Sequence, residues 1–410
     1  MKKIIVIGGG AAGMMAAGAA AEKGAQVVLI EKNRSLGRKV LITGKGRCNV
    51  TNACDDVEEL IANVTKNSSF LYSAFYGFSN LDTIKFFENL GVPLKVERGK
   101  RVFPESDESR SIVDALKHYL EKNGVKIIND IVDEILTEDE TAVGVCLQKG
   151  GIIKGDKVVL ATGGLSYQQT GSTGDGIWWA EDLGHKIEEP MPSLVPLKTV
   201  ESWPADLQGL SLKNIAITFY DEKNRKIYDD FGEMMFAHFG ITGPVVLSAS
   251  AHLRPMKKNK YKAVIDLKPA LDFKTLDARL LRDFEENKNK SLGNCLKNLL
   301  PVNMIGTFLS LCDIDYTKKV NVITKEERKT ILHKLKELEI TVEDFCPIEQ
   351  AIITSGGVSV KEINPSTMES KLIKNLYFCG EIIDVDAYTG GFNLQIAFST
   401  GRLAGISAAE

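Results

Sequence analysis

The sequence predicts an α/β fold of at least two domains, and three observations carry this prediction. The 410 residues are roughly two to three times the usual length of one domain. Hydrophobic side chains make up 44% and charged side chains 26%, an ordinary globular composition that excludes a wholly disordered chain. The first thirty residues follow the pattern strand, glycine-rich turn, helix and strand, which is typical of a dinucleotide-binding sheet.

Three segments form this N-terminal βαβ unit. Residues 4–7 are a β-branched run of the kind that forms a buried parallel strand, an alanine-rich helix is expected up to Lys23, and residues 26–30 form the second strand. The same stretch is similar to a secretory signal peptide, but its four closely spaced glycines make a poor apolar region. No other stretch is long and apolar enough to span a bilayer, so we expect no membrane contact.

The glycines between the first strand and the helix favour a bound pyrophosphate. Gly8 permits a tight turn, Gly10 lets the backbone approach the phosphates, and Gly13 lets the helix pack on the strand. The helix N-terminus offers unpaired N–H groups to the negative charge. Glu31, at the end of the second strand, can accept ribose hydroxyls and argues against a 2′-phosphate. This motif does not separate NAD from FAD, and a glycine-rich turn without a ligand is the alternative.

Two later segments favour FAD. Residues 157–164 form a strand that runs into a small-residue turn, and they resemble the ATG motif of two-dinucleotide-binding flavoproteins. Residues 376–381 resemble the segment whose acid holds the ribityl or pyrophosphate part of FAD. A helix over residues 392–401 would direct its positive end at the flavin edge that gathers negative charge on reduction. Plain buried strands with glycine-rich turns are the alternative.

Missing motifs argue against several other chemistries. No second GxGxxG unit follows Gly13, and residues 171–176 have the wrong spacing, so we expect no dedicated nicotinamide domain. The seven scattered cysteines lack metal-ligand spacing, so no metal is expected, and they favour a reduced, cytoplasmic protein. Cys48 and Cys54 are separated by five residues, which disfavours a redox-active disulfide. No GxSxG elbow supports a hydrolase.

Six motifs in order resemble those of one protein family. They occupy residues 37–52, 101–104, 236–244, 354–358, 367–371 and 380–395. They are similar to the motifs of the YhiN-like or BaiN-like flavoproteins, which include enzymes called aminoacetone oxidases, and the resemblance runs from residue 1 to about 408. It implies an α/β protein with a glutathione-reductase-type, Rossmann-like FAD-binding domain interrupted by a β-rich domain and a small helical domain. We therefore predict an FAD-binding domain at 1–190 and 348–410, a β-rich substrate-side domain at 191–266 and a helical domain at 267–347.

The motifs and the resemblance together predict the FAD contacts. Val132 follows a predicted strand where such flavoproteins usually pair their backbone with adenine. We expect non-covalent FAD, because no residue resembles a known attachment histidine or cysteine. The predicted cofactor-binding residues are Gly8, Gly10, Ala12, Gly13, Glu31, Lys32, Gly37, Arg38, Lys39, Gly46, Arg47, Cys48, Asn49, Asn52, Val132, Ala161, Thr162, Gly163, Gly380, Glu381, Gly391, Phe392, Asn393 and Gln395.

Three side chains are candidates for catalysis. Arg47 follows the first βαβ unit and could hold FAD or the electron-rich edge of the substrate, with a capped surface loop as the alternative. His238 could exchange a proton opposite the hydride, or it could be a structural histidine. Tyr388 is a second candidate acid, with core packing as its alternative.

Basic residues concentrate in one segment. Residues 254–336 hold 19 Lys and Arg against 10 Asp and Glu, a net charge of +9, whereas the whole chain carries −3. Such a segment favours a polyanion such as rRNA, and a solvated lysine-rich helical surface is the alternative.

The resemblance implies hydride exchange at flavin N5. Family members are associated with oxidation of an amino ketone by oxygen, reduction of double bonds in steroid-like acids and reduction of uridine in rRNA. We therefore predict an FAD-dependent oxidoreductase in which NAD(P)H reduces the flavin and the flavin reduces a carbon–carbon double bond, in rRNA uridine or in a small enone. The alternatives are an oxygen-dependent amine oxidase that produces hydrogen peroxide, and a flavin-bearing RNA-binding or assembly protein with structural FAD.

Overall fold

The computed structural model describes residues 1–410, which divide into two compact units. Unit 1 comprises Met1–Ser193 and Pro347–Glu410, and unit 2 comprises Leu194–Cys346. Unit 1 is therefore discontinuous in sequence, because the chain returns to it after completing unit 2. The division of residues 191–347 into a β-rich domain and a helical domain stays a prediction.

A five-stranded parallel sheet forms the centre of unit 1. Its strand order is β20-β11-β1-β2-β7, so the first strand of the chain lies in the middle. Ile4 pairs with Val27 on one side and with Lys157 on the other. The apolar residues of β1 are buried on both faces of the sheet, which suits a β-branched run. The strands are β1 (Lys3–Ile7), β2 (Gln26–Glu31), β7 (Lys126–Asn129), β11 (Lys157–Leu160) and β20 (Leu376–Phe378).

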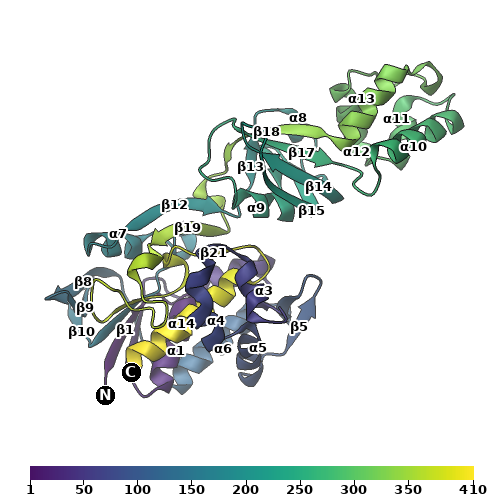
Figure 1. Ribbon diagram of the computed structural model, residues 1–410. Coiled ribbons are helices and arrows are strands. Elements are labelled where there is room, and N and C mark those ends of the chain that lie inside the picture. Colours follow the sequence, from purple (N-terminus) through teal and green to yellow (C-terminus); the bar gives the residue numbers. More distant parts are fainter. The chain divides into compact units, whose positions relative to one another are not determined.

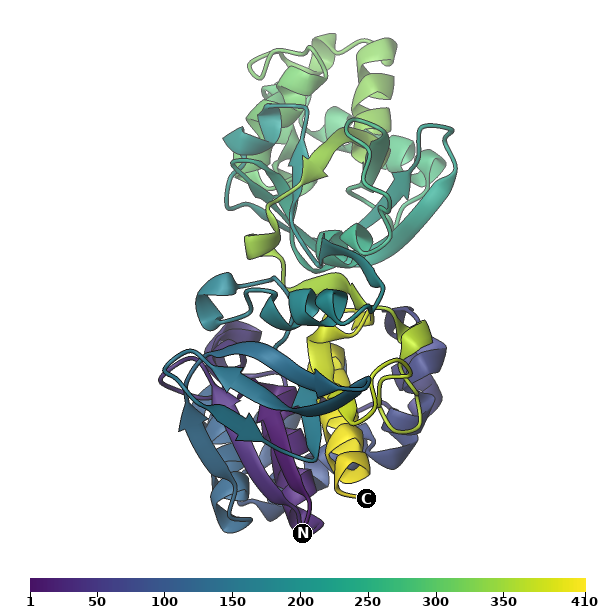
Figure 2. The same ribbon diagram turned by 90° about the vertical axis from the view of Figure 1, so that its left-hand side faces the viewer.

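The first and last helices of the chain pack side by side on this sheet. Figure 1 shows α1 (Ala11–Glu22, purple) beside α14 (Phe392–Ala409, yellow). Small residues allow the close approach, because a Cβ atom at Gly401 would lie 2.4 Å from the carbonyl oxygen of Ala12. A Cβ atom at Gly405 would lie 2.2 Å from the carbonyl oxygen of Ala16. Both ends of the chain accordingly lie at the same end of unit 1 (Figures 1 and 2).

Antiparallel ribbons and shorter helices surround the central sheet of unit 1. β12 is the last strand before unit 2, and it pairs with β19, the first strand after the return. The other ribbons are β10-β9-β8, β3-β6-β5 and β21-β4. Their strands are β3 (Thr51–Asn52), β4 (Val64–Lys66), β5 (Leu94–Glu97), β6 (Arg101–Pro104), β8 (Val132–Glu138), β9 (Thr141–Leu147), β10 (Ile152–Lys154), β12 (Ile187–Ser193), β19 (Ile353–Val358) and β21 (Asp386–Ala387). The remaining helices of unit 1 are α2 (Arg38–Ile42), α3 (Val57–Ala62), α4 (Tyr72–Gly77), α5 (Asn80–Asn89), α6 (Ser109–Lys122) and α7 (Asp175–Asp182).

Unit 2 contains a closed barrel with the strand order β13-β16-β15-β14-β17-β18, and helices α10 to α13 gather at one end of it (Figure 1). Alternate residues of β17 are buried, as expected for a strand with one face on a barrel core. β18 begins at Leu338, inside the predicted helical domain 267–347, and it closes the barrel between β17 and β13. The strands are β13 (Leu197–Thr199), β14 (Ser211–Tyr220), β15 (Lys226–Ala237), β16 (Gly240–Thr242), β17 (Tyr261–Asp266) and β18 (Leu338–Phe345). The helices are α8 (Trp203–Asp206), α9 (Pro244–Ser250), α10 (Phe273–Glu286), α11 (Leu292–Cys295), α12 (Val302–Leu311) and α13 (Lys325–Lys336).

Candidate cofactor site

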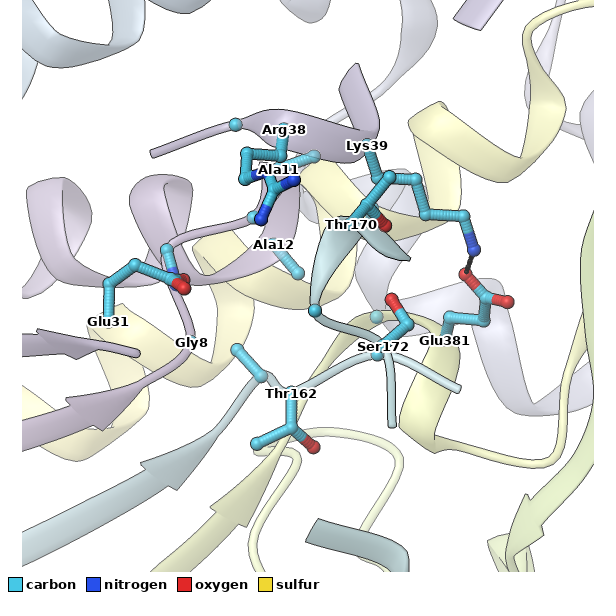
Figure 3. A pocket seen from close by; sticks show the side chains of 18 of the residues that line it. Gly8, Ala11, Ala12, Glu31, Arg38, Lys39, Thr162, Thr170, Ser172 and Glu381 are labelled. Atoms are coloured by element: carbon cyan, nitrogen blue, oxygen red, sulfur yellow. Dashed lines mark hydrogen bonds and ion pairs between the residues drawn. The ribbon is translucent and has the colours of Figure 1, made fainter. Parts of the chain in front are cut away.

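A cleft opens in unit 1 at the carboxyl ends of its parallel strands. The loops that follow β1, β2, β11 and β20 line it, and its volume is about 1360 Å³ including the open mouth. Ligands of open α/β sheets bind at this edge, and Figure 3 shows the lining side chains. The cleft brings together a large part of the predicted cofactor-binding set, namely Gly8, Gly10, Ala12, Glu31, Lys32, Gly37, Arg38, Lys39, Val132, Ala161, Thr162, Gly163, Gly380, Glu381 and Asn393.

The N-termini of α1 and α14 both border the cleft. Gly10 and Gly391 are their N-cap residues, and neither helix has a side-chain capping hydrogen bond. The first N–H groups of each helix therefore have no side-chain acceptor. Ala11 and Ala12 of α1 and Asn393 of α14 line the cleft. Two helix N-termini with free donors and positive partial charge suit a ligand that carries phosphates and a second electron-rich group.

Glu31 at the end of β2 holds the turn that follows β1. Its Oε2 accepts a hydrogen bond from the backbone N–H of Gly9 at 2.7 Å. Its Oε1 accepts from the backbone and side-chain nitrogens of Asn33, each at 2.7 Å. A carboxylate offers about four acceptor positions, so Glu31 retains capacity for ribose hydroxyls. The position of Glu31 at the end of a predicted strand identified it as a cofactor-binding residue, whereas no sequence motif identified Asn33.

An ion pair between Lys39 and Glu381 lies in the cleft wall (Figure 3). Lys39 Nζ is 2.5 Å from Glu381 Oε2 and 2.6 Å from Ser166 Oγ. The other oxygen of Glu381 accepts hydrogen bonds from Ser166 Oγ at 2.8 Å and from the backbone N–H of Thr354 at 2.9 Å. One charged pair thereby joins four separate segments at the cleft, namely α2, the loop after β11, β19 and the turn after β20.

Thr162 carries an unpaired polar atom behind the cleft wall. Its Oγ1 is buried, has no hydrogen-bond partner within the chain, and faces Gly176, where an added Cβ atom would lie 2.2 Å from it. Protein atoms therefore cover this hydroxyl, and it is not open to a ligand in the cleft. The two helix N-termini and Glu31 make the residues of the cleft a good fit to FAD. α1 would hold the pyrophosphate, Glu31 a ribose, and the segments after β11 and β20 the remainder.

Arg47 lies outside the cleft lining. Its guanidinium pairs with Glu97 and, at 2.5 Å, with Asp107, and it lies 4.2 Å from the centroid of the Phe103 ring. The hydrogen bonds to Glu97 and Asp107 raise the pKa of Arg47. Its predicted contact with FAD or substrate stays a prediction.

Several other predicted residues are packed beneath the site rather than in its lining. Cys48 is fully buried, and burial raises the pKa of its thiol to about 12. Gln395 is also fully buried, and its side-chain amide donates to the carbonyl of Phe78 at 3.1 Å. Asn52 donates from its side chain to the carbonyl of Gly390 at 3.1 Å. The predicted residues without a place in the lining are Gly13, Gly46, Arg47, Cys48, Asn49, Asn52, Gly391, Phe392 and Gln395, and their contact with FAD stays a prediction.

The two candidate proton donors belong to different units. His238 is exposed in the turn between β15 and β16 of unit 2, and its ring packs edge-on against Phe239 at 5.0 Å. Tyr388 is half-buried in unit 1, and its carbonyl oxygen accepts from the side-chain amide of Asn393, which lines the cleft, at 3.3 Å. Their catalytic roles stay predictions.

The sequence motifs did not predict one wall of the cleft. The glycine-rich stretch 171–176 contributes Gly171, Ser172 and Asp175, and Trp179 of α7 follows them into the lining. Asp175 also pairs with Lys32 at 2.6 Å. A glycine-rich turn directly before a short helix was the available signal, although its spacing does not fit a second nucleotide motif.

The fold and the site define a Rossmann-type flavoprotein of the oxidoreductase class. A family model described as HI0933-like protein Rossmann domain matches residues 2–407. The chain belongs to this HI0933-like family, and it is an FAD-dependent oxidoreductase. The resemblance to YhiN-like and BaiN-like flavoproteins and the predicted FAD-binding fold class are thereby confirmed.

Relatives match nearly the whole chain. The 3-dehydro-bile acid delta(4,6)-reductase of Clostridium scindens is 30% identical over 389 residues, which cover 94% of this chain and 93% of the relative. The ribosomal RNA dihydrouridine synthase of Escherichia coli K12 is 30% identical over 383 residues, which cover 92% of this chain and 91% of the relative. The structure of a 3-ketosteroid-delta4-(5alpha)-dehydrogenase from Rhodococcus jostii RHA1 has a TM-score of 0.54 at 15% identity, covers 100% of this chain and 97% of that chain, and shows a similar fold. None of the helices combines the length and the apolar character needed to cross a lipid bilayer.

Proposed function

We propose that this chain binds FAD non-covalently and reduces a carbon–carbon double bond, with NAD(P)H as a transient electron donor. The favoured acceptor is a uridine of rRNA, and a small enone is the second. The observation that carries this proposal is the match over more than nine-tenths of two relatives whose names describe saturation of a double bond, a delta(4,6)-reductase and a dihydrouridine synthase. All seven cysteines are free, which supports a reducing, cytoplasmic setting.

The residues of the cleft have separate tasks in this proposal. The N–H groups at the start of α1 bind the pyrophosphate, and Glu31 accepts ribose hydroxyls. The positive end of α14 stabilises negative charge on the electron-rich edge of the cofactor. Bound FAD supplies the hydride exchange at its N5 atom.

Saturation of a double bond requires a proton as well as a hydride. Arg47 is held as a cation by Glu97 and Asp107, so it releases no proton near neutral pH. We therefore assign the proton to His238 or Tyr388. A pH profile of kcat for His238→Gln and for Tyr388→Phe separates them, because only loss of the true donor removes the limb that reports its protonation.

The decisive experiment is an anaerobic titration of the FAD-loaded protein with NADH and NADPH, followed at the flavin absorbance band. Bleaching by a nicotinamide, slow recovery in air and fast recovery with an rRNA fragment or an enone are expected. Recovery as fast as oxygen mixes, together with bleaching by amino ketones, would instead identify an oxidase. Flavin that stays oxidised with every donor would make FAD structural and refute the proposal.

The charge distribution supports RNA as the larger acceptor. Residues 254–336 carry +9 in a chain of net charge −3. A concentrated positive surface lowers the free energy of binding to a phosphate backbone and makes binding sensitive to salt. We propose that this segment contacts RNA.

A further inference from the structure

Two loop segments at the helical end of unit 2 pair into a short ribbon. Residues 287–293 and 315–322 are joined by backbone hydrogen bonds of 2.8 to 3.1 Å. We call this pair of segments the lysine ribbon. Backbone pairing holds its lysines near one another, although they are far apart in sequence. These lysines are Lys288, Lys290, Lys318 and Lys319.

Two cations of the lysine ribbon have no carboxylate partner. Lys290 forms no ion pair, and Lys319 Nζ donates only to the carbonyl of Asn289 at 3.2 Å. Lys288 pairs with Glu285 at 2.9 Å, but both side chains are more than half exposed, so the pair is weak and exchangeable. The surface therefore keeps positive charge that the protein itself does not neutralise.

Asp315 is the only acidic residue of the lysine ribbon. It accepts hydrogen bonds from the side-chain hydroxyl of Thr317 at 2.5 Å and from its backbone N–H at 2.6 Å, and these bonds lower its pKa. Glu327, which lies outside the ribbon, pairs with Lys318. Four lysines against one aspartate leave the ribbon with a formal charge of +3, and Lys290 and Lys319 are exposed without an ion pair.

An aromatic ring in the same ribbon packs against a glycine and is partly exposed. The Tyr316 ring covers Gly293 so closely that a Cβ atom added at Gly293 would lie 2.2 Å from a ring carbon. Tyr316 nevertheless remains 38% exposed. A backbone hydrogen bond of 3.1 Å from the Gly293 N–H to the Tyr316 carbonyl fixes the two residues together. The ring is thus held in place within the same ribbon as the two unpaired lysines.

We propose that the lysine ribbon binds single-stranded RNA, with phosphates at Lys290 and Lys319 and a base stacked on Tyr316. Unpaired lysines beside an open aromatic ring are the combination by which single strands are bound, through phosphate contacts and base stacking. An acidic protein or an anionic membrane would bind the lysines of the ribbon but would have no base to stack on the Tyr316 ring. The inference rests on the proposed function for its choice of RNA, and it adds the surface and the strandedness of the partner.

The test measures fluorescence anisotropy of a labelled single-stranded RNA with the full-length, FAD-loaded protein at several salt concentrations. K290E/K319E removes two phosphate contacts, which corresponds to roughly a 25-fold loss of affinity near 0.1 M salt and a salt slope smaller by about 1.4. Y316A is expected to weaken binding roughly fivefold or more. The matched control K213E/K223E changes the net charge equally on exposed lysines of β14 and of the turn after it, and it should bind nearly as the wild type does.

Several results would overturn this inference. They are no binding of single-stranded RNA by the wild type, equal losses in K290E/K319E and in the control, or an unchanged affinity in Y316A. Anionic vesicles or poly-glutamate that bind as tightly as RNA would also overturn it. Thermal melting and far-UV circular dichroism of each variant establish that unit 2 is folded. RNA binding that persists when no hydride reaches uridine would refute the proposed function alone.

Discussion

Replacing Gly391 by alanine tests how α14 is seated at the cleft. Gly391 has φ +101°, a left-handed conformation that costs an alanine about 1–2 kcal/mol. The added Cβ atom would also lie 2.3 Å from the carbonyl group of Thr51. To lengthen this distance to an ordinary contact of about 3.4 Å, the start of α14 must move by about 1 Å. Such overpacking costs a further 1–3 kcal/mol or so of unfolding free energy. We expect a total loss of roughly 2–5 kcal/mol of unfolding free energy.

The matched control is Gly91→Ala. Gly91 has φ +83°, but no atom lies within 4 Å of its hypothetical Cβ, so only the conformational cost of about 1–2 kcal/mol applies. Thermal unfolding compares the two variants, and FAD fluorescence gives their dissociation constants. Gly391→Ala should weaken FAD binding roughly tenfold, because a displaced helix N-terminus loses hydrogen bonds to the electron-rich edge of the cofactor, each of which contributes about 0.5–1.5 kcal/mol. Equal destabilisation and equal FAD affinity in the two variants would refute the reasoning.

Three further predictions follow from groups in unit 1. Glu381→Gln leaves the ammonium of Lys39 without its carboxylate and should cost about 1–3 kcal/mol of unfolding free energy. In a double-mutant cycle, the double variant with Lys39→Met should recover part of this loss. Additive losses in the two single variants would contradict the ion pair. With its thiol pKa raised to about 12, Cys48 is almost wholly protonated at pH 8, so mass mapping should find a maleimide on half-buried Cys146 long before Cys48, and early labelling of Cys48 would count against its burial. Burial lowers the pKa of His185, with Glu362 opposing the shift, so only the unfolded chain gains a proton here just below about pH 6.5. The neutral His185 therefore contributes to the free energy of unfolding above that pH, and this contribution is lost as the pH falls. The melting temperature should drop more on acidification in the wild type than in His185→Gln. A steeper drop in the variant would contradict this.

Local signals predicted the strands and turns of the cofactor site. Residues 4–31 contain the first strand, the glycine turn, the helix and Glu31 within one continuous run, so spacing alone places them. Similar reasoning identified the strands at Lys157–Leu160 and Leu376–Phe378. These elements meet at one sheet edge because parallel strands present their carboxyl ends together.

The local sequence pattern did not predict contacts between residues that lie far apart along the chain. Arg47 follows the glycine motif, yet its partners Glu97 and Asp107 lie 50 and 60 positions away. Nothing in the local pattern around Arg47 indicates that these carboxylates, rather than a ligand, engage it. The same holds for Asn33, whose side chain donates to the carbonyl of Thr170, 137 positions away, at 3.2 Å. Side-chain partners of this kind are set by tertiary packing and not by periodicity.

The pairing of α1 with α14 has a consequence for biosynthesis. When translation reaches residue 346, unit 2 is complete, but unit 1 still lacks β19, β20 and α14. At about 5–20 residues per second, the missing 64 residues (347 to 410) take roughly 3–13 s to synthesise. During that interval the small-residue face of α1 and one edge of β11 have no partner, so a nascent chain is most prone to aggregate then. On the proposed function, FAD loading is expected to follow the synthesis of α14, whose N-terminus borders the cleft.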